Sequence, residues 1–527
     1  MSVYGPDSDQ LNLCAALVDE PCSRGRETAP AIREPMRLWT YAELYHYVCR
    51  TASALRSLGV DRGERVALLL HDSCEFAAAF LGAIRIGATA TPLSVLDRQY
   101  DFKQLLQNSG AVVAIVHADL VPEIEALRAE VPTLRHVIVV GAAAEPGQLS
   151  LAELAAAADD DASPADTAPD EPAFLLYTSG TGGTPKGVCH RHATALESFA
   201  AYGVGVLGLT EEDRFFAAPK KSTAYGLGAG LCFPLAAGAS TFLLPDRARP
   251  RTVLDVMTAF APTVFFGMPS LYGQLLHDLP QLGGRPGREY FSSVRVAISG
   301  SEALPPKLWH RVRDELGVEL LDGWGATEAF HFVLTNRPGA IRPGSSGQPV
   351  LGYEARVVDE DGAPVGPNEI GELEVRGSTV VTYYDAPPSE SGARVFREGW
   401  LHTNDQFFCD ADGYFWSSGR ADGRIKVGAT FVSPAEVEGA LLAHPAVWEC
   451  AVVGAEDEDG LLKPLAYVVP NVGHTPGPQL AREIMQFVKD QIAPVKYPRW
   501  VEFVQELPKN ASGKVQRHKL RPRPRSR

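Results

Sequence analysis

Residues 177–187 read Tyr-Thr-Ser-Gly-Thr-Gly-Gly-Thr-Pro-Lys-Gly, a loop rich in glycine and hydroxyl side chains that ends in a lysine. Glycines let backbone N–H groups approach anionic oxygens, hydroxyl groups donate further hydrogen bonds, and the lysine supplies positive charge. The loop therefore has the composition of a phosphate-binding site. It is not a Walker loop, because Pro185 precedes Lys186 and Gly187 follows it. Taken alone, such a loop is more often a simple connection.

A second motif lies near the C-terminus, where residues 508–517 read Pro-Lys-Asn-Ala-Ser-Gly-Lys-Val-Gln-Arg. The two stretches together resemble the acyl-adenylate-forming superfamily, which includes acyl- and aryl-CoA ligases, nonribosomal peptide synthetase adenylation domains and firefly luciferase. The resemblance extends from about residue 35 to residue 521. It implies that Lys514 bridges the substrate carboxylate and the α-phosphate of ATP during adenylation. It also implies that the first loop holds the β- and γ-phosphates, through Thr178, Ser179, Gly180, Thr181 and Lys186.

Residues 322–328 read Asp-Gly-Trp-Gly-Ala-Thr-Glu and resemble the family's aromatic-Gly-x-Thr-Glu motif. The resemblance implies that Trp324 stacks on adenine, Thr327 binds the α-phosphate and Glu328 holds Mg²⁺, an ion that prefers carboxylate and phosphate oxygens. It also assigns to the nucleotide site Asp322, Gly323, Gly300, Ser301 and Glu302. Without the other motifs, a strand–turn–helix junction with an exposed glutamate would be the simpler interpretation.

Thr403-Asn404-Asp405 resembles the family's Thr-Gly-Asp, and the resemblance implies that Asp405 accepts both ribose hydroxyls. Arg420 would reach the ribose or the α-phosphate, because its rigid fork of donors suits phosphate. Asp422 falls at the hinge between the family's two domains. The resemblance implies that, after rotation about this hinge, the loop at residues 426–431, with Lys426, Gly428 and Ala429, faces the thioester step. Four positions depart from the family pattern: Gly182, Asn404, Gly428 and Ala429.

The acid-binding residues resemble the benzoate-CoA ligase branch, on the segments 224–228, 330–339 and 460–464. The resemblance places Tyr225, Gly226 and His331 against the acid, with His331 one helical turn beyond Glu328 if a helix begins there. Ala224, Ala326 and Phe330 fit an apolar, flat-walled pocket. The alternative for Tyr225, Phe330 and His331 is an ordinary core position. Trp324 and residues 299–302 differ from the corresponding residues of benzoate-CoA ligases. The candidate substrates therefore include substituted benzoates, cinnamates, heteroaryl acids and naphthoates.

The fold predicted is α/β. Residues 40–142 alternate helices with continuous apolar strands, which indicates a parallel sheet covered on both faces. Residues 143–171 read as a solvated connector, residues 173–340 as a second α/β segment, and residues 345–418 as a β-rich subdomain. We therefore expect a large N-terminal domain of doubly wound sheets with a β-rich subdomain, residues 1–422. A small, mobile C-terminal α+β lid domain follows, residues 423–527.

Composition narrows the classes of function. Of 527 residues, 45% are hydrophobic and 21% charged, which is typical of a globular protein, and the formal charge of −15 argues against general nucleic-acid or membrane-surface binding. The eight cysteines are scattered without a Cys-x-x-Cys pair, which predicts free thiols. We find no signal peptide and no apolar run of 18 residues, so we expect a cytoplasmic location.

The expected function is an ATP- and Mg²⁺-dependent, AMP-forming aryl-CoA ligase whose partners are an aromatic acid, ATP and CoA. The rivals are an adenylating enzyme that loads a carrier protein, a luciferase-like monooxygenase, and a nucleotide-binding protein without activity. The oligomeric state is left open, a homodimer included.

Overall fold

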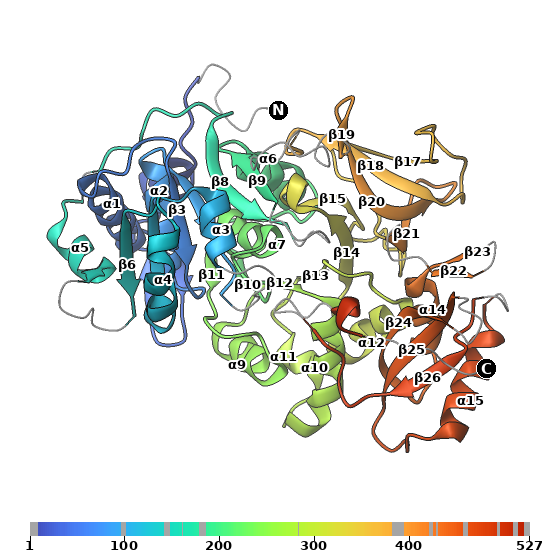
Figure 1. Ribbon diagram of the computed structural model, residues 1–527. Helices are drawn as coiled ribbons and strands as arrows, with labels where there is room; N and C mark the ends of the chain where they lie inside the picture. The colour runs from blue at the N-terminus through green and yellow to red at the C-terminus, as the bar shows by residue number, and fades with distance from the viewer. Residues whose placement is uncertain are drawn as a thin grey trace.

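The structure is a computed structural model that describes residues 9–95, 102–141, 148–160, 162–178, 186–282, 284–381, 395–420, 425–427, 430–456, 462–492, 496–509 and 515–520. Two helix-covered sheets form the N-terminal part, a β-rich region follows, and a smaller α/β unit ends the chain (Figure 1). This is the predicted α/β architecture.

The first sheet has the strand order β7-β6-β5-β3-β4-β8-β9, parallel except for the last pair. Its strands are β3 (Arg65–Leu69), β4 (Thr89–Pro92), β5 (Val113–His117), β6 (His136–Val140), β7 (Leu149–Ser150), β8 (Pro172–Tyr177) and β9 (Gly187–Arg191). Its helices are α1 (Tyr41–Ser57), α2 (Cys74–Arg85), α3 (Phe102–Ser109), α4 (Val121–Leu127) and α5 (Leu151–Ala157). A capping box formed by Thr40 and Glu43 starts α1.

One prediction for this region is wrong. The stretch 143–171 is not only a connector, because it contains β7 and α5. Leu151 and Ala155 are buried there, so these apolar residues contribute to packing that a solvated linker would lack.

Helices cover both faces of the first sheet, as the continuous apolar strands predict. Val66 and Leu68 of β3 pack in the same core as α1 and α2, whereas Ala67 and Leu69 pack in a second core with α3 and α4. This follows from the alternation of side chains along a strand. The first core also reaches the second sheet, so the two sheets share one hydrophobic interior.

The second sheet has the order β16-β15-β14-β13-β12-β10-β11-β1-β2, with a parallel centre from β14 to β1. Its strands are β1 (Pro30–Arg33), β2 (Leu38–Thr40), β10 (Arg214–Ala217), β11 (Ser240–Phe242), β12 (Val264–Gly267), β13 (Val296–Ser299), β14 (Leu320–Gly325), β15 (Phe332–Thr335) and β16 (Gln348–Pro349). Its helices are α6 (Thr194–Ser198), α7 (Ala224–Leu227), α8 (Phe233–Ala237), α9 (Pro250–Phe260), α10 (Pro269–Leu282), α11 (Gly287–Tyr290) and α12 (Pro306–Arg311).

The β-rich region and the C-terminal unit complete the chain. The former contains β17 (Tyr353–Val358), β18 (Gly371–Gly377), β19 (Phe396–Arg397), β20 (Trp400–Cys409) and β21 (Phe415–Arg420). The latter contains β22 (Ile425–Val427), β23 (Thr430–Val432), α14 (Pro434–Leu442), β24 (Val447–Glu456), β25 (Leu462–Pro470), α15 (Pro478–Lys489) and β26 (Trp500–Phe503). Separate hydrophobic clusters fill the C-terminal unit.

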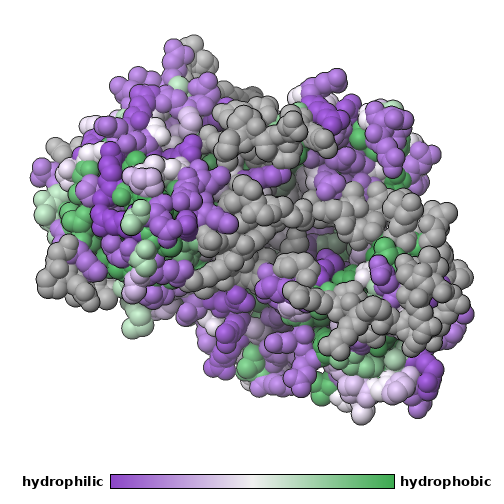
Figure 2. Space-filling view, viewed as in Figure 1, coloured by the Kyte–Doolittle hydropathy of each residue, from purple (hydrophilic) through white to green (hydrophobic). Residues whose placement is uncertain are grey.

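Hydrophilic residues predominate on the face drawn in Figure 2, and hydrophobic residues lie among them in small groups. Such a mixture is normal for a protein exterior. No helix within the described ranges combines the length and hydropathy that crossing a bilayer requires. All eight cysteines are free, as predicted.

Candidate active site

The glycine-rich loop connects two antiparallel strands. Tyr177 pairs with Gly187 at the ends of β8 and β9, and Thr178 donates its N–H to the carbonyl of Lys186 over 3.1 Å. The loop thus begins at the carboxyl end of β8, which runs parallel to β4. Ligands of open α/β sheets bind beyond the carboxyl ends of parallel strands. Ser179, Gly180 and Thr181 lie outside the described residues.

The predicted adenine motif, residues 322–328, begins within β14 and extends past its end. Gly323 and Gly325 permit tight packing there: a Cβ on Gly323 would meet the Phe332 ring at 2.7 Å, and one on Gly325 would meet the His331 carbonyl at 2.3 Å. Thr327 and Glu328 belong to a 3₁₀ turn, Thr327–Ala329, and are partly exposed. The turn presents the Glu328 carboxylate, the kind of ligand that Mg²⁺ prefers.

Trp324 and Asp405 meet although 81 residues separate them. The indole Nε1–H of Trp324 donates to Asp405 Oδ2 over 2.9 Å. Asp405 lies on β20, directly opposite Arg420 of β21 in the strand register. The structure therefore brings together the residues predicted to contact adenine and ribose.

The backbone explains the asparagine that replaces the family's glycine before Asp405. Asn404 has a φ of 59°, in the left-handed region. Glycine adopts this conformation most readily, and asparagine follows because its short side chain can bond locally. Asn404 N–H donates to Glu372 Oε1, and Asp405 N–H donates to Thr403 Oγ1. Asparagine at position 404 can therefore form the same turn as the family's glycine.

Residues 299–302 begin at the last residue of β13, Ser299, which pairs with Asp322 of the motif. Ser301 has a φ of 71°, a strained value for serine. A Cβ on Gly300 would meet the Phe332 ring at 2.4 Å. Glu302 Oε2 accepts the N–H of Ser270 near the start of α10. Burial raises the pKa of Asp322 well above its ordinary value.

Most residues predicted to bind the acid lie on α7 or directly before β15. Thr223 caps α7, and its hydroxyl accepts the N–H of Gly226. A Cβ at Gly226 would lie 2.0 Å from the Lys220 carbonyl, so this turn requires glycine. Tyr225 stacks on Phe332 with ring centres 5.3 Å apart and donates its hydroxyl to the Gly267 carbonyl.

His331 is almost fully buried in an aromatic cluster. Its ring lies 4.6 Å from that of Phe233, 5.5 Å from Tyr225 and 4.9 Å from Phe332. Within the described part of the chain, neither ring nitrogen has a hydrogen-bond partner. Burial lowers the pKa of His331 to about 3, so the ring is neutral near pH 7. The alternative of a core histidine satisfied by the backbone does not describe this side chain.

The prediction that His331 lies one helical turn beyond Glu328 is wrong. The 3₁₀ turn ends at Ala329, Phe330 takes a φ of 67°, and His331 leads into β15. The chain reverses because β15 pairs antiparallel with β14. The same reversal points Phe330 into the core, where its ring contacts Phe174 and His190. Ala326, within the motif, is partly exposed.

Two buried residues near α7 were not predicted from the sequence. Lys221 is completely buried, and its Nζ lies 3.4 Å from Asp72 Oδ2 while donating to the carbonyls of Ala217 and Pro219. Asp72 also accepts the N–H of Lys221. This pair ties the loop after β3 to the segment before α7. Nothing in the sequence signals it, because adjacent lysines usually indicate an exposed segment.

The residues expected from the C-terminal domain are described only in part. Asp422, Gly428, Ala429 and Lys514 lie outside the described residues, and only the backbones of Arg420 and Lys426 are described. Lys307 of α12 donates to the carbonyls of Leu442 and Ala443 at the end of α14, so the C-terminal unit contacts the large one.

Comparison with known proteins agrees with this arrangement. The model of the AMP-binding enzyme family matches residues 19–385, and that of the AMP-binding enzyme C-terminal domain matches residues 436–514. Benzoate–CoA ligase of Thauera aromatica is 41% identical, over 97% of this chain and 96% of that protein.

Two solved structures are also similar over nearly their whole length. The anthranilate CoA ligase in complex with anthranoyl-AMP has a TM-score of 0.92 at 39% identity, covering 98% of this chain and 97% of that one. A benzoate CoA ligase of Burkholderia xenovorans LB400 has a TM-score of 0.88 at 36% identity, covering 97% and 99%. The chain belongs to the AMP-binding enzyme family.

Proposed function

We propose that this protein is an ATP-dependent, AMP-forming aryl-CoA ligase acting on a benzoate-like or larger aromatic acid. The observation that carries the proposal is similarity over nearly the full chain to ligases named for benzoate and anthranilate, both aromatic acids. The substrates are the acid, ATP and CoA, and Mg²⁺ is the metal. The acid attacks the α-phosphate and releases pyrophosphate, and the CoA thiol then displaces AMP.

The nucleotide residues fit ATP. Trp324 offers a flat ring to adenine beside the Asp405 carboxylate, which suits ribose hydroxyls because a carboxylate accepts several hydrogen bonds. Thr327 serves the α-phosphate, and the loop that starts at Thr178 serves the other phosphates with Lys186. Mg²⁺ on the Glu328 carboxylate would neutralise phosphate charge. Gly300, Ser301, Glu302, Asp322 and Gly323 complete the walls of this site.

The acid pocket is proposed between α7 and β15. Tyr225 and Phe332 provide aromatic surface, and Ala224, Gly226 and Ala326 are the small residues proposed to line the pocket. His331 supplies a neutral imidazole whose ring nitrogens lack partners among the described residues, so it can bond the carboxylate or a ring substituent. Phe330 supports this wall from the core side.

The C-terminal domain is proposed to serve the two half-reactions in turn. The boundary would fall at Asp422, giving domains 1–422 and 423–527. Lys514 would stabilise charge during adenylation, with Arg420 on the ribose or α-phosphate. The loop at residues 426–431, with Lys426, Gly428 and Ala429, would face the CoA thioester step. A cytoplasmic location is proposed because all eight thiols are free.

A single experiment tests the function. Pyrophosphate release is measured over a panel of benzoates, cinnamates, heteroaryl acids and naphthoates, and the thioester product is assayed with free CoA and with a holo-carrier protein. We expect at least one aromatic acid to release pyrophosphate and form a CoA thioester. Thioester only on the carrier would replace this proposal with carrier loading, oxygen uptake with light would indicate a luciferase-like reaction, and no release with any acid would contradict adenylation.

A further inference from the structure

Two histidines lie at the carboxyl ends of neighbouring parallel strands in the first sheet. His117 is the last residue of β5, and His71 follows β3 by two residues. The register Leu69↔Val116 brings both ends to the same edge of the sheet. Asp119 comes from the 3₁₀ turn, Ala118–Leu120, that directly follows β5. Three side chains from two connections therefore meet at one place.

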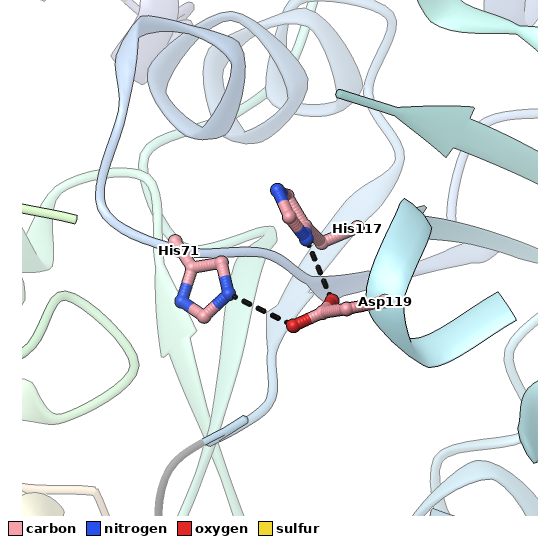
Figure 3. A group of neighbouring side chains, drawn as sticks. All are labelled: His71, His117 and Asp119. Carbon is pink, nitrogen blue, oxygen red and sulfur yellow. Dashed lines mark hydrogen bonds and ion pairs between the residues drawn. The ribbon is translucent and has the colours of Figure 1, made fainter. Parts of the chain in front are cut away.

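The three side chains point toward one another (Figure 3). His117 Nδ1 lies 2.6 Å from Asp119 Oδ1, and His71 Nε2 lies 3.4 Å from Asp119 Oδ2. The two imidazole rings meet edge to face, with centres 4.6 Å apart. One ligand atom of each residue falls within 4.8 Å of the others. The carboxylate thus lies between two imidazoles.

We propose that His71, His117 and Asp119 form a binding site for a first-row divalent metal ion such as Zn²⁺. Imidazole nitrogen and carboxylate oxygen are both Zn²⁺ ligands at about 2.0–2.2 Å, and three protein ligands leave a coordination position for water. Mg²⁺ and Ca²⁺ prefer oxygen ligands alone, so two imidazoles select against them. The site is therefore different in chemistry from the carboxylate and phosphate site proposed at Glu328.

The side chains can close around an ion. Donor atoms around tetrahedral Zn²⁺ lie about 3.4 Å apart, as its bond lengths require. The 3.4 Å between His71 Nε2 and Asp119 Oδ2 matches that spacing, whereas His117 Nδ1, at 2.6 Å from Asp119 Oδ1, would move away from the carboxylate to admit an ion. The side chains of His71, His117 and Asp119 are 24%, 33% and 54% exposed, so they can rotate without disturbing the core. The backbone ends of β3 and β5 are held by the sheet, which limits the rearrangement needed.

The position of the site predicts that a bound ion would restrain a neighbouring loop and stabilise the folded chain. His71 immediately precedes Asp72, whose carboxylate pairs with Lys221 ahead of α7. A bound ion would cross-link the ends of β3 and β5 and restrain the loop that carries Asp72. Because an ion that binds only the folded state stabilises it, thermal unfolding should shift upward with Zn²⁺.

The test is Zn²⁺ binding by the full chain, stripped with a chelator and followed by isothermal titration calorimetry. The matched control is His46→Ala, because His46 also contacts an aspartate, Asp160 at 2.9 Å, but belongs to no cluster with a second imidazole among the residues that the structure describes. We expect His71→Ala and His117→Ala each to weaken one Zn²⁺ equivalent by at least roughly 10–100-fold. His46→Ala should leave that equivalent unchanged.

A second arm keeps the test decisive if an alanine variant folds poorly. Asp119→Asn preserves size and should also weaken binding, and Co²⁺ should give a visible d–d band in the parent chain that these variants lose. Adenylation with Mg²⁺ should be unchanged in the variants, since none belongs to the proposed active site. Equal Zn²⁺ stoichiometry and affinity in the parent chain and a His71→Ala/His117→Ala double variant would overturn the proposal, as would the absence of any Zn²⁺ binding.

Discussion

Trp324 donates its indole N–H to the Asp405 carboxylate over 2.9 Å, which joins the end of β14 to β20 of the β-rich region. The bond holds a ring and a carboxylate in one relative position, as binding of an adenosine group requires. Trp324→Phe keeps an aromatic surface but removes the donor. Since a hydrogen bond to a charged group is worth about 1.5 kcal/mol, KM for ATP should rise roughly tenfold.

The matched control for this substitution is Trp416→Phe. Trp416 donates to Asp410 over 3.0 Å, in the same kind of indole–carboxylate pair but outside the proposed site. Steady-state kinetics should show an unchanged KM for ATP in Trp416→Phe and an unchanged KM for the acid in both variants. An ATP effect of equal size in the two variants would mean that only general stability has changed.

Several parts of this arrangement can be predicted from the sequence because they depend on local signals. Apolar runs located the strands of the first sheet, and the family resemblance supplied Asp405 and Glu328 as candidate nucleotide-site residues. Contacts set by tertiary packing could not be predicted. The positive φ of Phe330 replaced the expected helix, and the burial of Lys221 depends on Asp72, 149 residues away.

His331→Leu should separate acid binding from stability. The substitution removes a buried imidazole with no hydrogen-bond partner among the described residues, which saves a desolvation cost of about 1–3 kcal/mol. Thermal stability should hold or rise, while KM for the aryl acid rises and KM for ATP stays nearly fixed, as expected for loss of a substrate contact.

The control for His331 is His192→Leu. His192 is also buried, but its Nδ1 accepts the N–H of Leu13 over 3.0 Å, so its loss should lower stability without changing KM for the acid. If acid and ATP parameters move together in His331→Leu, or if only stability falls, His331 is a structural residue.

Lys514→Ala should distinguish the two half-reactions. A positioned ammonium stabilises the negative charge that develops when the carboxylate attacks the α-phosphate, so adenylate formation should fall by roughly 10²–10³-fold. Thioester formation from prepared aryl-AMP should be largely spared. Lys509→Ala is the control, since Lys509 pairs with Glu449 inside the C-terminal unit. Equal loss in both half-reactions would contradict the role assigned to Lys514.

Ser301→Gly should stabilise the protein. Ser301 is exposed and has a φ of 71°, where a Cβ costs about 1–2 kcal/mol and glycine fits without strain. Glycine also loses more conformational entropy on folding, so the expected net gain is roughly 0.5–1 kcal/mol in urea unfolding. Ser292→Gly, at an exposed serine without positive φ, should instead reduce stability slightly. The same sign for both variants would show that strain at 301 is unimportant.

Buried histidines should make stability depend on pH in the mildly acidic range. Burial lowers the pKa of His190 and His331 to about 3 and that of His192 to about 4, from an ordinary value of 6.5. As pH falls below 6.5, the unfolded chain takes up protons that the folded chain does not, so the free energy of unfolding falls. Each histidine should contribute a slope approaching about 1.4 kcal/mol per pH unit until the pH reaches its folded pKa. Urea unfolding between pH 7.5 and 5 measures this slope, and His331→Leu should reduce it by up to about 1.4 kcal/mol per pH unit, the contribution of one such histidine. A stability difference between His331→Leu and the parent chain that is constant over this range would show that His331 is not held neutral by burial.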